Sequence, residues 1–359
     1  MVDHKFSNPN RATVLDQLMG FGARCVCRLP EPLIKRLAGP AISIDGQKLD
    51  PLIQLTLRWF ADPPGKVPEL HTLRRTFDIQ ATWLSKPLDP SIGIRTIQID
   101  GPHGAINCEV HQRVGQTSPA PAFLFFHGGG HSGGSLMSHR PVAHRLAKEL
   151  CCTVFAIDYR LAPENPFPVG IEDCLAAYDH IADHAQTFGI DPRRIIIGGD
   201  SAGANVTAVL AQQRRDAPIP PALQVLWVPW MEMRTDTRSY ELFDVGYFLE
   251  KPTMDWYIDN YVKSAQDAEN PKASPLLGTT EGLCPAVVLI AGFDPLRDEG
   301  LAYAQKLQDA GVTTHVRVFD DLVHPMVNLV PFVPAATRAW DETMTLIKAS
   351  LSGEHVACQ

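Results

Sequence analysis

The chain has 359 residues, of which 45% are hydrophobic and 20% charged, and a formal net charge of −8 at pH 7. This length is ample for a large hydrophobic core, and the apolar and charged fractions are those of an ordinary globular protein. The negative charge argues against a nucleic acid or an anionic membrane as a partner, and no apolar run approaches the length of a membrane span.

The first part of the chain, residues 1–85, is mainly helical in pattern and is interrupted by prolines, with no alternation of strands. Its first twenty residues lack a basic stretch leading into an apolar run, so we expect no signal peptide. We predict that this segment contributes to a helical cap.

From about residue 94, short β-rich runs alternate with helical patterns, which is typical of a mostly parallel sheet with helices on both faces. The predicted strands are 94–100, 106–113, 123–126, 153–157, 195–197, 224–228, 286–290 and 315–319. The predicted helices are 141–150, 171–188, 202–213, 298–309 and 334–351. The fold class is therefore α/β, with a sheet core formed by residues 86–230 and 266–359.

Residues 231–265 interrupt this alternation and are unusually aromatic. The rings are Tyr240, Phe243, Tyr247, Phe248, Trp256, Tyr257 and Tyr261. We predict a cap insertion over the carboxyl edge of the sheet, where such folds place their sites. The rings expected to contact substrate are Phe243, Tyr247, Phe248 and Trp256, with ordinary helix packing as the alternative for each of them.

The sequence GDSAG at 199–203 follows an apolar run and opens a helical segment. A nucleophile at a strand-to-helix turn needs a tight backbone, and flanking glycines make such a turn sterically possible. The N-terminus of the following helix also favours negative charge at the site. We therefore predict Ser201 as the nucleophile of a serine hydrolase.

The sequence HGGG at 127–130 ends another apolar run. The tetrahedral intermediate of acyl transfer carries its charge on the former carbonyl oxygen, so it requires preorganised N–H donors. We predict the backbone amides of Gly128, Gly129 and Ala202 as these donors. His127 is expected to brace the loop and not to act as the base.

The base is found by elimination, because the chain order in this fold is serine, acid and then histidine. His324 follows the predicted strand 315–319, whereas His315 lies at the start of that strand and His355 lies near the chain end. Asp294 follows the strand 286–290 and is the predicted acid, with Asp298 as the alternative. Asp294 would orient the ring of His324, which would take the proton of Ser201.

These motifs resemble those of the hormone-sensitive-lipase-like esterases, the bacterial family IV of the α/β-hydrolase superfamily. The resemblance covers roughly residues 90–350 and rests on HGGG, DYRLAPENPFP at 158–168, GDSAGAN at 199–205 and DPLRDEG at 294–300. It implies an eight-stranded sheet with its second strand antiparallel, and a cap built from the N-terminus and the insertion. It also implies the same triad and oxyanion donors, hydrolysis of short-to-medium acyl esters without a cofactor, and a possible homodimer.

The sequence departs from the pattern of that family in two places. Ala204 stands where a second glycine is usual, and Pro325 and Met326 follow His324 in place of the frequent Gly-Phe pair. Four functions remain open: a carboxylesterase, which leads, an amidase or peptidase, a true lipase, and a non-catalytic receptor for a small ligand. All three triad positions are filled, which disfavours the receptor.

The eight cysteines lack the spacing of a disulfide framework or of a metal site. Buried, reduced thiols of a cytoplasmic protein are the simplest interpretation. We expect no metal and no membrane or nucleic-acid partner.

Overall fold

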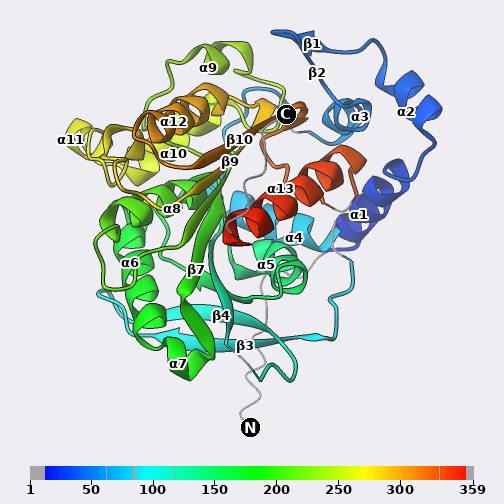
Figure 1. Cartoon of the computed structure of the whole chain (residues 1–359). Coiled ribbons are helices and arrows are strands. Elements are labelled where there is room, and N and C mark those ends of the chain that lie inside the picture. Colours follow the sequence, from blue (N-terminus) through cyan, green and yellow to red (C-terminus); the bar gives the residue numbers. More distant parts are fainter. Residues whose placement is uncertain (1–12, 62, 84–85, 118, 331, 353–359) are drawn as a thin grey trace.

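The computed structural model describes residues 13–61, 63–83, 86–117, 119–330 and 332–352 (Figure 1). Its main element is an eight-stranded sheet in the order β10-β9-β8-β7-β5-β6-β4-β3. The strands are β3 (Ile92–Ile99), β4 (Ile106–Arg113), β5 (Ala120–Phe126), β6 (Thr153–Asp158), β7 (Ile190–Asp200), β8 (Leu223–Trp227), β9 (Ala286–Phe293) and β10 (Thr314–Val323). The reversed strand is β4, which pairs antiparallel with both β3 and β6, whereas all other pairs in this sheet are parallel. This confirms the strand count and the reversed second strand.

The largest difference from the predicted strand positions is in β7, which begins at Ile190 and not at 195. The pair Asp191-Pro192 is a turn signal in the sequence, yet both residues lie inside this strand. In the pairing with β5, Ala120 lies opposite Ile190 and Ala122 lies opposite Ile195. The strand β7 therefore has extra residues between these two pairs that do not pair with β5. The turn signal therefore coincides with an irregularity inside the strand.

Helices cover both faces of the sheet (Figure 1). One face carries α5 (Leu136–Glu149) and α13 (Pro334–Ser352), and the other carries α6 (Val169–Asp183), the short α7 (Ala185–Phe188), α8 (Ala202–Gln213) and α12 (Arg297–Asp309). Successive side chains of a strand point to opposite faces, so Phe123 and Phe125 of β5 pack towards α5 and α13. Leu124 and Phe126 pack towards α6 and α8.

The N-terminal segment forms α1 (Val14–Val26), α2 (Glu31–Ala38), α3 (Pro51–Phe60) and α4 (Leu70–Trp83). It also contains a hairpin of β1 (Ser43–Ile44) and β2 (Gln47–Lys48), which the helical pattern of this segment did not predict. Its turn residues Asp45 and Gly46 have φ of 56° and 82°, values typical of two-residue hairpin turns. Residues 1–12, 62 and 84–85 of the predicted segment lie outside the described residues.

The insertion after β8 contains α9 (Arg238–Leu242), α10 (Lys251–Tyr261) and α11 (Ala265–Ala268), and a short 3-10 helix (Pro275–Leu277) precedes β9. Asp45 of the hairpin forms ion pairs with Arg238 of α9 at 2.7 Å and with Arg297 of α12 at 2.9 Å. The hairpin, the insertion and the start of α12 are therefore joined to one another.

Within the part of the chain that the structure describes, no helix is both long and apolar enough to cross a bilayer. The seven cysteines in that part are all free thiols.

Candidate active site

The predicted functional residues lie in four loops that each follow a strand directly. The HGGG loop follows β5, Ser201 follows β7, Asp294 follows β9 and His324 follows β10. These strands are parallel within one sheet, so their carboxyl ends meet at the same edge, where α/β sheets bind ligands.

Ser201 lies in the turn between β7 and α8, with φ of 56° and ψ of −117°. This backbone conformation is rare for a residue with a side chain, and it costs about 1–3 kcal/mol. A Cβ atom on Gly199 would lie 2.2 Å from the carbonyl oxygen of Phe126, and one on Gly203 would lie 1.9 Å from it. Both flanking residues must therefore be glycine, because the end of β5 passes too close for any side chain.

Asp294 and His324 form a hydrogen-bonded pair. Nδ1 of His324 lies 2.7 Å from Oδ2 of Asp294, and Oδ1 of Asp294 accepts the amide of Leu296 at 2.9 Å. Because a carboxylate only accepts, the proton is on Nδ1 and the neutral ring has a free lone pair on Nε2. This is the tautomer that a general base needs.

The alternative acid, Asp298, has other partners. Its carboxylate accepts the amide of Ser239 in α9 at 2.8 Å and pairs with Arg297 at 2.9 Å. It therefore attaches the insertion to α12.

The carboxyl group of Asp200 is buried beside the nucleophile and lies near three imidazole rings. Burial alone would raise its pKa, but the nearby rings of His139, His127 and His324 outweigh burial and hold that pKa below its usual value. His324 is therefore close enough to act electrostatically on the residue that precedes Ser201.

The HGGG loop differs from the expectation at one position. The amide of Gly128 donates to Oδ1 of Asp200 at 3.1 Å, so its only hydrogen is already used and Gly128 is not available as an oxyanion donor. The amides of Gly129, Gly130 and Ala202 have no acceptor among the described residues. The sequence could not show this, because the contact depends on a side chain 72 residues away.

His127 braces the loop, as expected. Its Nδ1 donates to the carbonyl oxygen of Gly128 at 2.9 Å, and its own carbonyl oxygen accepts the hydroxyl of Tyr159 at 2.6 Å. The rings of His127 and Tyr159 stack at 4.5 Å. Burial lowers the pKa of His127 to about 4, so the ring is neutral at pH 7.

Two further elements hold this loop, and neither was predicted from the sequence. Arg74 of α4 donates to the carbonyl oxygens of Ser132 at 2.8 Å and of Ala162 at 3.0 Å. His131 stacks on Tyr261 of α10 with 3.9 Å between ring centroids and an interplanar angle of 7°. The N-terminal segment and the insertion therefore both contact the HGGG loop.

The four aromatic residues expected to bind substrate lie in different surroundings. Phe243 is fully buried and packs on Phe293 at 5.4 Å, so it belongs to the core and has no free surface for a ligand. Tyr247 is half-buried and packs against the same two rings. Phe248 is exposed, whereas Trp256 is half-buried beside Tyr257 at 5.3 Å.

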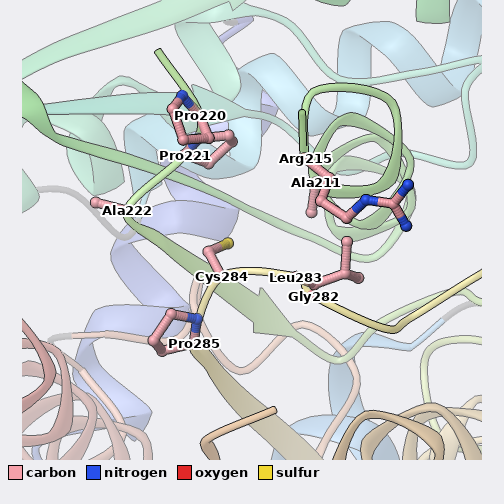
Figure 2. Close-up of a pocket in the computed structure, with 9 residues that line it drawn as sticks. All are labelled: Ala211, Arg215, Pro220, Pro221, Ala222, Gly282, Leu283, Cys284 and Pro285. Carbon is pink, nitrogen blue, oxygen red and sulfur yellow. The ribbon is translucent and has the colours of Figure 1, made fainter. Parts of the chain in front are cut away.

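A surface pocket of about 200 Å³ lies elsewhere on the molecule (Figure 2). Pro220, Pro221 and Pro285, just before β8 and β9, line it together with Arg215 and Cys284. It is at the amino-terminal edge of the sheet, opposite to Ser201. No group of three or more His, Cys, Asp or Glu residues in the described ranges is arranged to hold a metal ion.

Comparison with known proteins identifies a family with the alpha/beta hydrolase fold, whose model matches residues 123–328. The chain is 35% identical over 350 residues to the carboxylic ester hydrolase LipN of Mycobacterium tuberculosis, covering 93% of this chain and 92% of that protein. It is 32% identical over 299 residues to an ethyl acetate hydrolase of Pseudomonas putida, covering 80% and 92%. The crystal structure of a thermostable esterase from Pseudomonas putida is 30% identical with a TM-score of 0.80, covering 86% of this chain and 99% of that one.

Proposed function

Because this chain belongs to the α/β-hydrolase family and is a carboxylic ester hydrolase, we propose that it cleaves esters of short-to-medium acyl chains with Ser201 as nucleophile. The observation that carries this proposal is the 2.7 Å pair of Asp294 and His324, at the sheet edge where Ser201 occupies its constrained turn. The similarity to an ethyl acetate hydrolase supports the short end of the range of acyl lengths.

The reaction proceeds through an acyl-enzyme intermediate. Oγ of Ser201 attacks the carbonyl carbon of the ester while Nε2 of His324 takes its proton. His324 returns this proton to the leaving alcohol as the C–O bond breaks, and water then releases the acid by the reverse steps. Asp294 holds the ring in position and stabilises the imidazolium that forms. No cofactor takes part in these steps.

The oxyanion is bound by the amides of Gly129, Gly130 and Ala202. Gly130 replaces Gly128 in this set, because the amide of Gly128 is already bonded to Asp200. Ala202 is the first residue of α8, so the positive end of the helix dipole adds to the stabilisation of the charge. Each such donor typically contributes about 2.7–4 kcal/mol to the lowering of the barrier.

We further propose that residues 1–85 and 231–265 form the cap of this site, and that the protein acts in the cytoplasm. Contacts of Arg74 and Tyr261 with the loop that follows β5 support the cap, and the free thiols of the described cysteines support a reducing compartment. Recovery of the activity from a secreted or periplasmic fraction of the source cells would contradict the location.

The first experiment is hydrolysis of p-nitrophenyl esters with acyl chains from C2 to C12 by the wild type and by Ser201→Ala. We expect turnover of the short esters that is lost in the variant, with the same circular dichroism spectrum for both proteins. Anilides and emulsified triglyceride test the amidase and lipase alternatives. A folded wild type that binds these esters without turning them over would instead favour the receptor.

A further inference from the structure

The ring of Tyr257 lies directly against the third glycine of the HGGG loop. A Cβ atom built on Gly130 would lie 2.3 Å from Cγ and Cδ1 of this tyrosine and 2.5 Å from its Cδ2. Tyr257 belongs to α10 of the cap insertion and is 4% exposed. The cap therefore places an aromatic ring on the backbone that carries two of the proposed oxyanion donors.

Tyr257 also packs in the buried cluster that includes the start of α8. It belongs to the same cluster of buried contacts as Ala202, the residue that follows Ser201. The glycine loop and the start of α8 are the two sides of the proposed oxyanion site, and this ring packs against the first of them at Gly130.

The hydroxyl group of Tyr257 has no hydrogen-bond partner among the described residues. Three tyrosines of the insertion have a hydroxyl without such a partner, but they differ in their exposure to solvent. The hydroxyls of Tyr240 and Tyr261 are closed off from solvent, whereas Tyr257 keeps 4% of its surface exposed. An almost fully buried phenol that keeps some exposed surface, and whose hydroxyl no described residue satisfies, has the arrangement expected of a ligand contact.

We propose that Tyr257 is a substrate-binding residue: its ring forms a wall of the ester pocket at Gly130, and its hydroxyl hydrogen-bonds an oxygen of the ester group. This inference rests on the proposed esterase function. Burial keeps the pKa of Tyr257 above its usual range, so the phenol is protonated at neutral pH and can donate. Trp256, the residue expected from the sequence, packs beside it with 5.3 Å between ring centroids.

Tyr257→Phe tests the hydroxyl, because it removes one atom and leaves the ring in place. The ester group is common to all substrates of the C2–C8 p-nitrophenyl series, so we expect kcat/KM to fall about tenfold at every acyl length. The melting temperature should stay unchanged. A variant within twofold of the wild type, or a loss confined to some acyl lengths, would overturn this role.

Tyr261→Phe is the matched control, because this residue lies one turn further along α10 and also has an unpartnered hydroxyl. That hydroxyl is fully buried and cannot contact a substrate. We expect its kcat/KM within twofold of the wild type. An equal loss in both variants would point to a general disturbance of α10 and would overturn the proposal.

Tyr257→Ala tests the wall, because it opens space beside Gly130. We expect the fall-off with acyl length to move towards longer chains, and Tyr257→Leu serves if the alanine variant does not fold. If a folded variant shows the same dependence of kcat/KM on acyl length as the wild type, the ring of Tyr257 does not form a wall of the ester pocket. Failure of the proposed function is distinguishable, since it would appear in the wild type and Ser201→Ala before any change at residue 257.

Discussion

The amide of Gly128 and the carboxylate of Asp200 are joined by a hydrogen bond of 3.1 Å, which fastens the HGGG loop to the residue before the nucleophile. The second carboxylate oxygen lies 3.3 Å from Nε2 of His139 in α5. The proposed donors on the loop follow β5, whereas the proposed donor at Ala202 follows β7. The bond between Gly128 and Asp200 holds these two segments at a fixed distance from each other. Asp200 is thus a positioning residue for the oxyanion site.

Asp200→Ala should lower kcat by about 10- to 100-fold, because loss of the bond lets the loop move relative to Ser201. KM should change by less than threefold if only transition-state contacts are lost. Asp200→Asn keeps an acceptor for Gly128 and should recover part of the rate. Steady-state kinetics on p-nitrophenyl butyrate measures both, and equal rates for the alanine variant and the wild type would contradict the positioning role.

Asp294→Asn should reduce kcat by about ten-thousandfold, because the amide group no longer holds His324 in the productive tautomer. Asp298→Asn is the matched control four residues later and should stay within threefold of the wild type, since Asp298 contacts Ser239 and Arg297. The comparison uses the same esterase assay. A larger loss of kcat in Asp298→Asn than in Asp294→Asn would identify Asp298 as the acid of the triad.

Gly203→Ala should destabilise the protein by more than about 4 kcal/mol or prevent folding, since the new Cβ would lie 1.9 Å from the carbonyl oxygen of Phe126. Gly22→Ala is the control, because this glycine lies in α1 with no atom within 4 Å of the Cβ position. There, alanine should add about 0.5–1 kcal/mol of stability. Urea unfolding of the three proteins gives both values, and a stable Gly203→Ala variant would show that the turn can relax.

Acid should destabilise the fold through His127 and His131, whose pKa values burial lowers to about 4 and about 3. An unfolded histidine titrates near 6.5, so below that pH the unfolded chain binds protons that the folded one does not. The stability is complete above about pH 6.5 and declines as the pH falls towards the folded-state pKa values. At pH 5 the loss is about 2 kcal/mol for each residue.

The measurement for this prediction is urea unfolding between pH 4.5 and pH 8. His131→Phe keeps a ring to stack on Tyr261 and removes one titrating group, so its stability should fall less steeply with acid. Parallel pH profiles for the variant and the wild type would exclude His131 as a source of the acid sensitivity.

The sheet could be predicted from the sequence because its central strands are buried on both faces and therefore appear as continuous apolar runs. The positions of Ser201, Asp294 and His324 followed from the same feature, since each comes directly after such a run. The hairpin at 43–48 was missed although Asp45-Gly46 is a hairpin signal, because each of its strands has only two residues. The bond that occupies the amide of Gly128 and the packing of Tyr257 against Gly130 could not be predicted, because contacts between distant segments decide which groups remain free.

The ion pairs of Asp45 have a consequence for evolution and for protein engineering. Arg297 lies three residues after Asp294 and is 6% exposed. One of its two carboxylate partners is Asp45, in the hairpin turn 252 positions earlier in the chain. A buried guanidinium that loses a partner typically costs about 3–5 kcal/mol. A chimera that imports its first 85 residues from a relative must therefore also import an acid at the position of Asp45, and we expect residues 45 and 297 to be exchanged together.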